Sequence, residues 1–131
     1  MTRDEKAFFS VPIPLEMLDG AAPLRVDLGE GFEAVALLHA GRPVVYRDLC
    51  PHMGGPMSEG TYEPRGGTLS CPWHGYEFDA ATGAFARNPN KDIFACMHGL
   101  YKTHKPETTP ALRLQALEHE LEDGRVWVRR P

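Results

Sequence analysis

Two short segments of the sequence carry residues that could hold a metal. Residues 50–55 read CPHMGG and residues 71–75 read CPWHG, so Cys50 and His52 lie in one segment and Cys71 and His74 in the other. Proline stiffens a turn and glycine lets backbone N–H groups approach sulfur, so each segment suits a tight loop. Thiolates and imidazoles are ligands of zinc and of transition metals. The four residues therefore predict a metal centre between two loops.

The composition limits the kind of protein that surrounds this site. A chain of 131 residues has the usual size of one domain, and we take residues 1–131 as a single domain. The formal net charge of -4 supplies no basic field for nucleic acid or anionic lipid. The sequence shows neither a leader-like segment nor an apolar run long enough to span a bilayer. We therefore expect a cytoplasmic protein that binds no nucleic acid and no membrane.

Short strands joined by turns are expected along the chain, because 13 Gly and 12 Pro interrupt any long helix. Residues 32–39 and 43–47 are apolar and partly β-branched, and Ala40-Gly41 between them is a turn signal, so together they predict a hairpin. Residues 76–79 predict a further strand that ends in a tight turn, where Gly83 is free to take a positive φ. The fold class expected is all-β.

The last part of the chain predicts another hairpin. In residues 111–121 (ALRLQALEHEL) the apolar positions change parity, which fits a strand with a bulge near Ala116, and a short helix is the alternative. Residues 122–125 (EDGR) have turn chemistry, and residues 126–128 (VWV) are strongly β-prone.

Residues 88–109 have no clean period and predict a long loop, which is a candidate surface for a partner. Cys96 lies in this loop beside apolar neighbours, and we expect it to be a small buried residue rather than a ligand. With only three cysteines in the chain, a disulfide scaffold is a poor explanation for the sequence.

The two metal-binding segments resemble those of the Rieske family, whose pattern is C-x-H, an interval of somewhat under twenty residues, and C-x-x-H. The likeness continues through residues 71–79 (CPWHGYEFD) and covers about residues 32–89. The interval, residues 53–70, is slightly long, and residues 63–67 are the expected place of the extra residues. The type resembled is the ferredoxin and oxygenase type, because the chain has His52-Met53 and Trp73 where the respiratory members have a second cysteine in each loop.

This resemblance implies one [2Fe-2S] cluster per chain, with Cys50 and Cys71 on one iron and His52 and His74 on the other. It also implies a Rieske-type antiparallel β-sandwich of three layers, in which a small cluster-binding subdomain occupies about residues 47–89. Residues 90–109 then form an insertion that has no counterpart in the family.

The resemblance also bears on the reduction potential. Where the high-potential respiratory members carry a serine and a tyrosine, this chain has Tyr76 and Phe78. Phe78 cannot donate a hydrogen bond to the cluster sulfur, so we expect a potential toward the low end of the family range of roughly -150 to +300 mV. Trp73 is explained equally well as a shield of the cluster, as part of a docking surface or as a packing residue.

The function implied is that of a Rieske-type ferredoxin, which carries one electron from a flavin-dependent reductase to a terminal oxygenase and is not itself an enzyme. The chain is too short to hold the mononuclear iron domain of a terminal oxygenase as well. Other readings of the same residues stay open: a small electron-transfer subunit of a larger reductase such as nitrite reductase, a cluster-based redox sensor, and a zinc-binding module.

Overall fold

A computed structural model describes residues 11–18, 22–51, 54–73, 75–87 and 112–129. The predicted all-β class is confirmed, because these residues form short strands and two single-turn 3₁₀ helices. In chain order the elements are β1 (Val11–Pro14), η1 (Leu15–Met17), β2 (Leu24–Asp27), β3 (Glu33–His39), β4 (Arg42–Arg47), η2 (Met57–Glu59), β5 (Thr61–Glu63), β6 (Thr68–Ser70), β7 (Glu77–Asp79), β8 (Phe85–Arg87), β9 (His119–Glu122) and β10 (Arg125–Val128).

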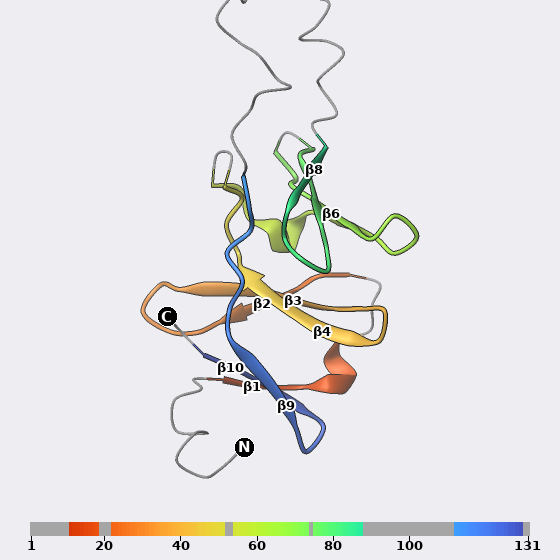
Figure 1. Ribbon diagram of the computed structural model, residues 1–131. Coiled ribbons are helices and arrows are strands. Elements are labelled where there is room, and N and C mark those ends of the chain that lie inside the picture. The colour runs from red at the N-terminus through yellow and green to blue at the C-terminus, as the bar shows by residue number, and fades with distance from the viewer. Residues whose placement is uncertain (1–10, 19–21, 52–53, 74, 88–111, 130–131) are drawn as a thin grey trace, which may run out of the picture.

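The strands form three antiparallel sheets that lie one above another in Figure 1. The first sheet has the order β1-β10-β9, the second β2-β3-β4 and the third β5-β6-β7-β8. The second sheet is the middle layer, since successive side chains of a strand point to opposite faces and β3 is buried on both. Ala34 and Ala36 of β3 pack with residues of the first sheet, whereas Val35 and Leu37 pack with residues of the third.

Two hydrophobic cores result, one on each face of the middle sheet. We call the core between the first and second sheets the base core; it consists of Ile13, Leu18, Val26, Leu28, Ala34, Ala36, Val45, Leu117, Val126 and Val128. We call the core between the second and third sheets the loop-side core; it consists of Val35, Leu37, Tyr46, Cys50, Met57, Tyr62, Leu69, Cys71, Tyr76, Phe78, Ala80 and Leu114.

The predicted hairpins are confirmed. β3 pairs with β4 from Ala34 opposite Arg47 to His39 opposite Arg42, and Ala40 and Gly41 form the turn with φ values of 53° and 77°. The predicted turn at residues 122–125 joins β9 to β10, which pair in register. Residues 64–67 form the turn of the β5–β6 hairpin, whose last pair joins Glu63 to Thr68, and that the extra residues of the interval lie here stays a prediction.

The segment before β9 differs from both sequence interpretations. It is not helical, so the short-helix alternative is wrong, and it is not one continuous strand: isolated bridges join Arg113 to Ala84 and Ala116 to Tyr46. The parity change of the apolar residues has a simple cause. Leu114 is buried in the loop-side core and Leu117 in the base core, because the segment crosses from the third sheet to the first.

No local signal predicted β1, which contains Pro12 and Pro14. The strand forms because it lies at the edge of its sheet and pairs only with β10, so its prolines need no ladder partner on the outer side. The third sheet and the described parts of both Cys-Pro segments fall within residues 47–89, and the division into subdomains stays a prediction. Residues 90–109, and with them Cys96, lie outside the described residues.

Within the described ranges, neither of the helical turns has the length or the hydrophobicity that a membrane-spanning helix requires.

Candidate metal centre

The segment that begins at Cys50 is a closed loop. The backbone N–H of Cys50 donates to the carbonyl of Gly55 at 2.7 Å, and the N–H of Gly54 donates back to the carbonyl of Cys50 at 2.7 Å. Gly54 takes a φ of 79°, which a side chain would oppose. The chain therefore reverses within six residues and returns beside its own cysteine.

The segment that begins at Cys71 repeats this geometry. The N–H of Cys71 donates to the carbonyl of Tyr76 at 2.8 Å, and the N–H of Gly75 donates to the carbonyl of Cys71 at 3.0 Å. Gly75 has a φ of 73°. In both loops the cysteine bonds to the residue five positions on, and a glycine four positions on bonds back to the cysteine. The expectation of two tight Cys-Pro loops agrees with these hydrogen bonds.

The two cysteines are buried and lie in the same core. Cys50 is 1% exposed and Cys71 is 3% exposed, and neither takes part in a disulfide. A side chain at Gly55 would begin 3.0 Å from the Sγ of Cys71 and 3.0 Å from the indole of Trp73. The first loop therefore lies directly against the sulfur of the second, and a side chain at Gly55 would crowd this contact.

Asp48 holds the first loop to the element that follows it. Its buried carboxylate accepts the backbone N–H of Ser58 at 2.6 Å and also the hydroxyl of Ser58, while its own N–H donates to the carbonyl of Glu33 at 3.0 Å. The strand that leads into the loop and the 3₁₀ helix η2 that leaves it are thereby joined. Sequence analysis missed this residue, because an acid and a serine ten positions apart give no local signal.

Tyr46 joins the middle sheet to the third sheet below the loops. Its hydroxyl donates to the carbonyl of Ala80 at 2.7 Å, and burial raises the pKa of Tyr46 to about 12, with the charge of Asp79 acting in the same direction. Gly83, which has the predicted positive φ of 77°, leaves room for this ring: a side chain there would begin 2.9 Å from the Tyr46 Cε1. The turn after β7 is thus fitted to Tyr46.

Tyr76 and Phe78, on which the expected reduction potential of the cluster depends, are both buried. Phe78 is wholly buried and packs edge to face on Phe85 at a centroid distance of 6.0 Å. Burial raises the pKa of Tyr76, and the negative charge of the Cys50 thiolate raises it further. The Tyr76 hydroxyl therefore stays neutral near this sulfur.

His52 and His74 lie outside the described residues, so the predicted set of four ligands stays a prediction. The part of the chain that the structure describes contains no group of three or more His, Cys, Asp or Glu residues that could hold a metal, and it includes only the two cysteines of the set. What it brings together is the pair Cys50 and Cys71. Buried, unoxidised thiols on two facing loops fit an iron–sulfur cluster, whose irons bind thiolate.

A three-sheet antiparallel fold with two matched Cys-Pro loops at one end defines a class: small β domains that bind an iron–sulfur cluster. The sequence model of the Rieske [2Fe-2S] domain matches residues 13–102, and this chain belongs to that family. Its cofactor is a [2Fe-2S] cluster.

Solved structures share this fold. The Sphingomonas yanoikuyae B1 ferredoxin superposes with a TM-score of 0.67 at 21% identity, covering 91% of this chain and 95% of that one. The ferredoxin of carbazole 1,9a-dioxygenase from Nocardioides aromaticivorans IC177 gives 0.67 at 19% identity, covering 93% and 100%. Dicamba monooxygenase gives 0.67 at 24% identity, covering 93% of this chain but only 34% of that one. The chain therefore has the all-β fold of these Rieske-type ferredoxins. A sequence search of curated proteins gives no match.

Proposed function

We propose that this chain is a Rieske-type ferredoxin that carries one electron from a flavin-dependent reductase to a terminal oxygenase and catalyses no reaction on a substrate. The observation that supports this most strongly is the pair of matched loops, which hold two buried thiols against each other at one end of a β protein. The likeness in fold to ferredoxins, one of them from a dioxygenase system, supports the same proposal.

In this proposal Cys50 and Cys71 hold one iron, and His52 and His74 hold the other. A [2Fe-2S] cluster with these ligands supplies reversible one-electron chemistry, and neutral imidazoles in place of two thiolates leave the oxidised centre without net charge. Such a centre accepts an electron more readily than one with four thiolates. We keep the expectation of a potential toward the low end of the family range, because Phe78 has no hydrogen bond to give.

The role of the surrounding residues is to keep the thiols in place and away from water. The paired backbone hydrogen bonds of each loop, together with the Asp48 contacts to Ser58, do not depend on the charge of the metal centre. The loops can therefore keep one geometry in both oxidation states, which is what a carrier needs. Burial of both cysteines excludes water from the sulfur side.

A surface beside the loops is suited to transient contact with partners. Leu49 and Trp73 are 40% and 56% exposed, and they flank Cys50 and Cys71 in the sequence. Both lie over the first loop, since a side chain at Gly54 would begin 3.6 Å from Leu49 and one at Gly55 would begin 3.0 Å from Trp73. Contiguous exposed apolar side chains, unlike scattered single ones, mark protein contact sites. In the proposal, the reductase and the oxygenase both dock here.

The test is an anaerobic redox titration of purified protein followed by repeated reduction and reoxidation. We expect each chain to take up one electron, to show the rhombic paramagnetic signal of a reduced [2Fe-2S] centre, and to keep its iron over many cycles. Loss of iron at each oxidation would favour the redox sensor instead. A colourless protein with one zinc per chain would overturn the proposal in favour of the zinc-binding module.

A further inference from the structure

A groove lies away from the two cysteine loops, where the three sheets come together. Its walls come from the end of the β3–β4 hairpin, from Ala81 in the turn after β7, and from His119 at the start of β9. Its volume is about 650 Å³, and a smaller hollow of about 100 Å³ adjoins it at Val44, Ala81 and His119. It is large enough for a small organic molecule or for a side chain of another protein.

The charge of this groove is opposite to that of the chain. The protein has a formal net charge of -4, yet among the described residues no carboxylate lines the groove, which contains Arg42 together with the imidazoles of His39 and His119. The described ion pairs engage other arginines, namely Arg25, Arg87 and Arg129. Within the described ranges Arg42 is exposed and has no acidic partner. Its guanidinium is therefore available to an anion from outside.

His39 is held so that one ring nitrogen remains for a ligand. Its Nδ1 lies 2.8 Å from the hydroxyl of Tyr62, and the two rings meet edge to face at a centroid distance of 5.9 Å. When the phenol donates to Nδ1, the Nε2 carries the hydrogen and offers an N–H. His39 and Arg42 are also directly paired across the hairpin, so their side chains lie on one face of the sheet.

His119 adds a second imidazole to the wall of the groove. Its Nδ1 lies 3.0 Å from the carbonyl oxygen of Leu117, and its Nε2 lies 3.2 Å from the carbonyl oxygen of Pro43. These two contacts fix the position of the ring at the wall of the groove. The rest of the lining, including Pro43, Val44 and Ala81, is apolar.

We propose that this groove binds a carboxylate attached to an apolar body, with the carboxylate on Arg42 and the Nε2 of His39 and the apolar body against Pro43, Val44 and Ala81. Guanidinium and carboxylate form two parallel hydrogen bonds, which makes arginine the expected anchor. This inference does not depend on the proposed electron transfer. The carboxylate can come from a free small molecule or from an acidic side chain of a partner protein, and the two sources are separated by experiment.

The test is isothermal titration calorimetry on the intact, iron-loaded chain with three probes. Benzoate represents the free small molecule, an acetylated and amidated peptide Phe-Glu-Phe represents the protein source, and benzamide is the uncharged match for benzoate. We expect saturable binding of benzoate or of the peptide, and the tighter of the two identifies the source. We expect no binding of benzamide.

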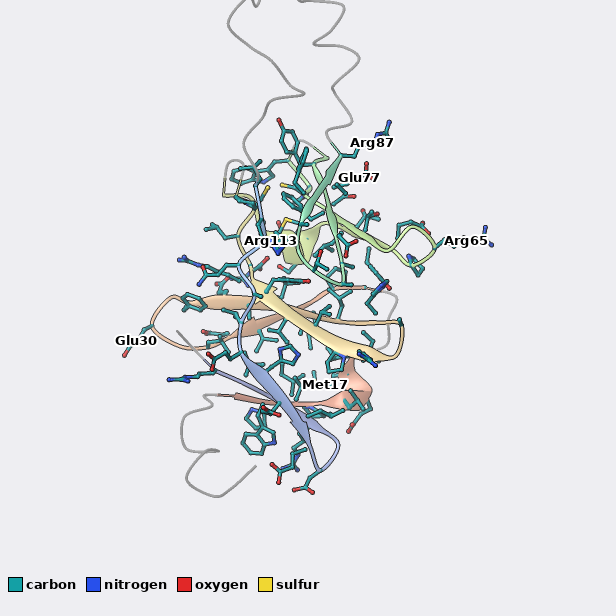
Figure 2. The ribbon with its side chains drawn as sticks, in the orientation of Figure 1. Met17, Glu30, Arg65, Glu77, Arg87 and Arg113 are labelled. Atoms are coloured by element: carbon teal, nitrogen blue, oxygen red, sulfur yellow. The ribbon has the colours of Figure 1, made fainter. Side chains whose placement is uncertain are left out.

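Two variants test whether the probes bind in the groove. Arg42→Gln should weaken the tighter probe by about tenfold or more, because it removes the charged partner of the carboxylate. Arg65→Gln is the matched control: Figure 2 shows Arg65 pointing away from the body of the protein at the end of the β5–β6 turn, and its loss should leave affinity unchanged. An unchanged visible spectrum confirms that both variants are folded. Absence of binding by both charged probes, or equal binding by Arg42→Gln, overturns the proposal.

Discussion

The base core and the loop-side core share β3 and β4 as a common wall but differ in what fills them. Every member of the base core is an aliphatic side chain. The loop-side core contains three tyrosines, one phenylalanine, one methionine and both described cysteines. The outer strands differ little in length: each strand of the first sheet has 4 residues and each strand of the third sheet has 3.

This difference indicates which part of the fold depends on the cluster. The base core is closed by alternating aliphatic residues on paired strands, a pattern that is stable without further support. The loop-side core is closed by turns and by single hydrogen bonds from buried polar groups, and it contains two buried thiols. We infer that the base folds by itself and that the loop side reaches full stability only with the cluster bound.

Removal of a cysteine should have the largest effect on stability. It should loosen the loop-side core and leave the base core unchanged. In Cys71→Ala we expect loss of the cluster and its colour, with faster hydrogen exchange at residues 61–87 and little change in β3 and β10, because only the loop side loses its metal. Iron analysis and hydrogen exchange with mass spectrometry provide the measurements. Cys96→Ala serves as the control and should keep its iron. Equal loosening of both cores would contradict the division.

Gly60, which directly precedes β5 of the third sheet, should be the position next most sensitive to substitution. A side chain at Gly60 would begin 1.8 Å from the carbonyl oxygen of Ser70, so Gly60→Ala must displace β5 from β6. We expect the free energy of unfolding to fall by about 1–3 kcal/mol or more.

Gly66→Ala is the matched change in the same hairpin, where the nearest atom would lie at 3.7 Å and the backbone φ is not positive. There we expect a change of under about 0.5 kcal/mol. Urea unfolding of both variants compares them, and equal stabilities would show that the third sheet tolerates a shift.

Removal of the Tyr46 hydroxyl should lower the free energy of unfolding by a smaller amount, and this amount should depend on pH. Tyr46→Phe removes the hydrogen bond to Ala80 and should cost about 1 kcal/mol at neutral pH. The pKa of Tyr46 is about 12 in the folded protein and about 10 in the unfolded chain, so above pH 10 the unfolded chain releases this proton first.

The stabilisation from Tyr46 should therefore be complete below pH 10 and should be lost at about 1.4 kcal/mol per pH unit as the pH rises toward 12. Unfolding at pH 8 and pH 11 measures the difference between the wild type and Tyr46→Phe. That difference should vanish or change sign at pH 11, because the loss of about 1.4 kcal/mol exceeds the stabilisation of about 1 kcal/mol. A constant difference would mean that Tyr46 ionises in the folded protein as it does in water.

The smallest change in stability is expected from an exposed ion pair on the surface that covers the base core. Arg129 and Glu118 form an ion pair at 3.0 Å, with side chains 46% and 73% exposed. Exposed pairs of this kind contribute little, so Arg129→Ala should change the free energy of unfolding by less than about 0.5 kcal/mol. Thermal unfolding measures this change. A loss of stability as large as that of Gly60→Ala would contradict the expectation that the third sheet is the more sensitive region.

The same contrast explains how much could be predicted from the sequence. The β3–β4 and β9–β10 hairpins follow from local signals, because alternating apolar residues and turn residues such as Asp123-Gly124 act within a few positions. β1 could not be predicted, since Pro12 and Pro14 argue against a strand until its place at a sheet edge is known. The parity change near Ala116 was visible, but its cause, a crossing between two cores, is a property of the assembled fold.

For the site, the Cys-Pro segments were found from residue types and spacing alone. The residues that hold the loops were not found, because their contacts join distant positions. Asp48 bonds to Ser58, Tyr46 bonds to Ala80, and Gly55 makes room for Cys71. None of these pairs has a spacing that a helix, strand or turn would produce, so only the folded structure brings them together.

The central claim is that one iron of the cluster is held by Cys50 and Cys71 and the other by His52 and His74. Its most direct test is pulsed electron paramagnetic resonance of the reduced protein labelled with ¹⁵N-histidine. We expect two strongly coupled imidazole nitrogens in the wild type and only one in His52→Cys or His74→Cys. A wild-type spectrum without coupling to histidine nitrogen would contradict it.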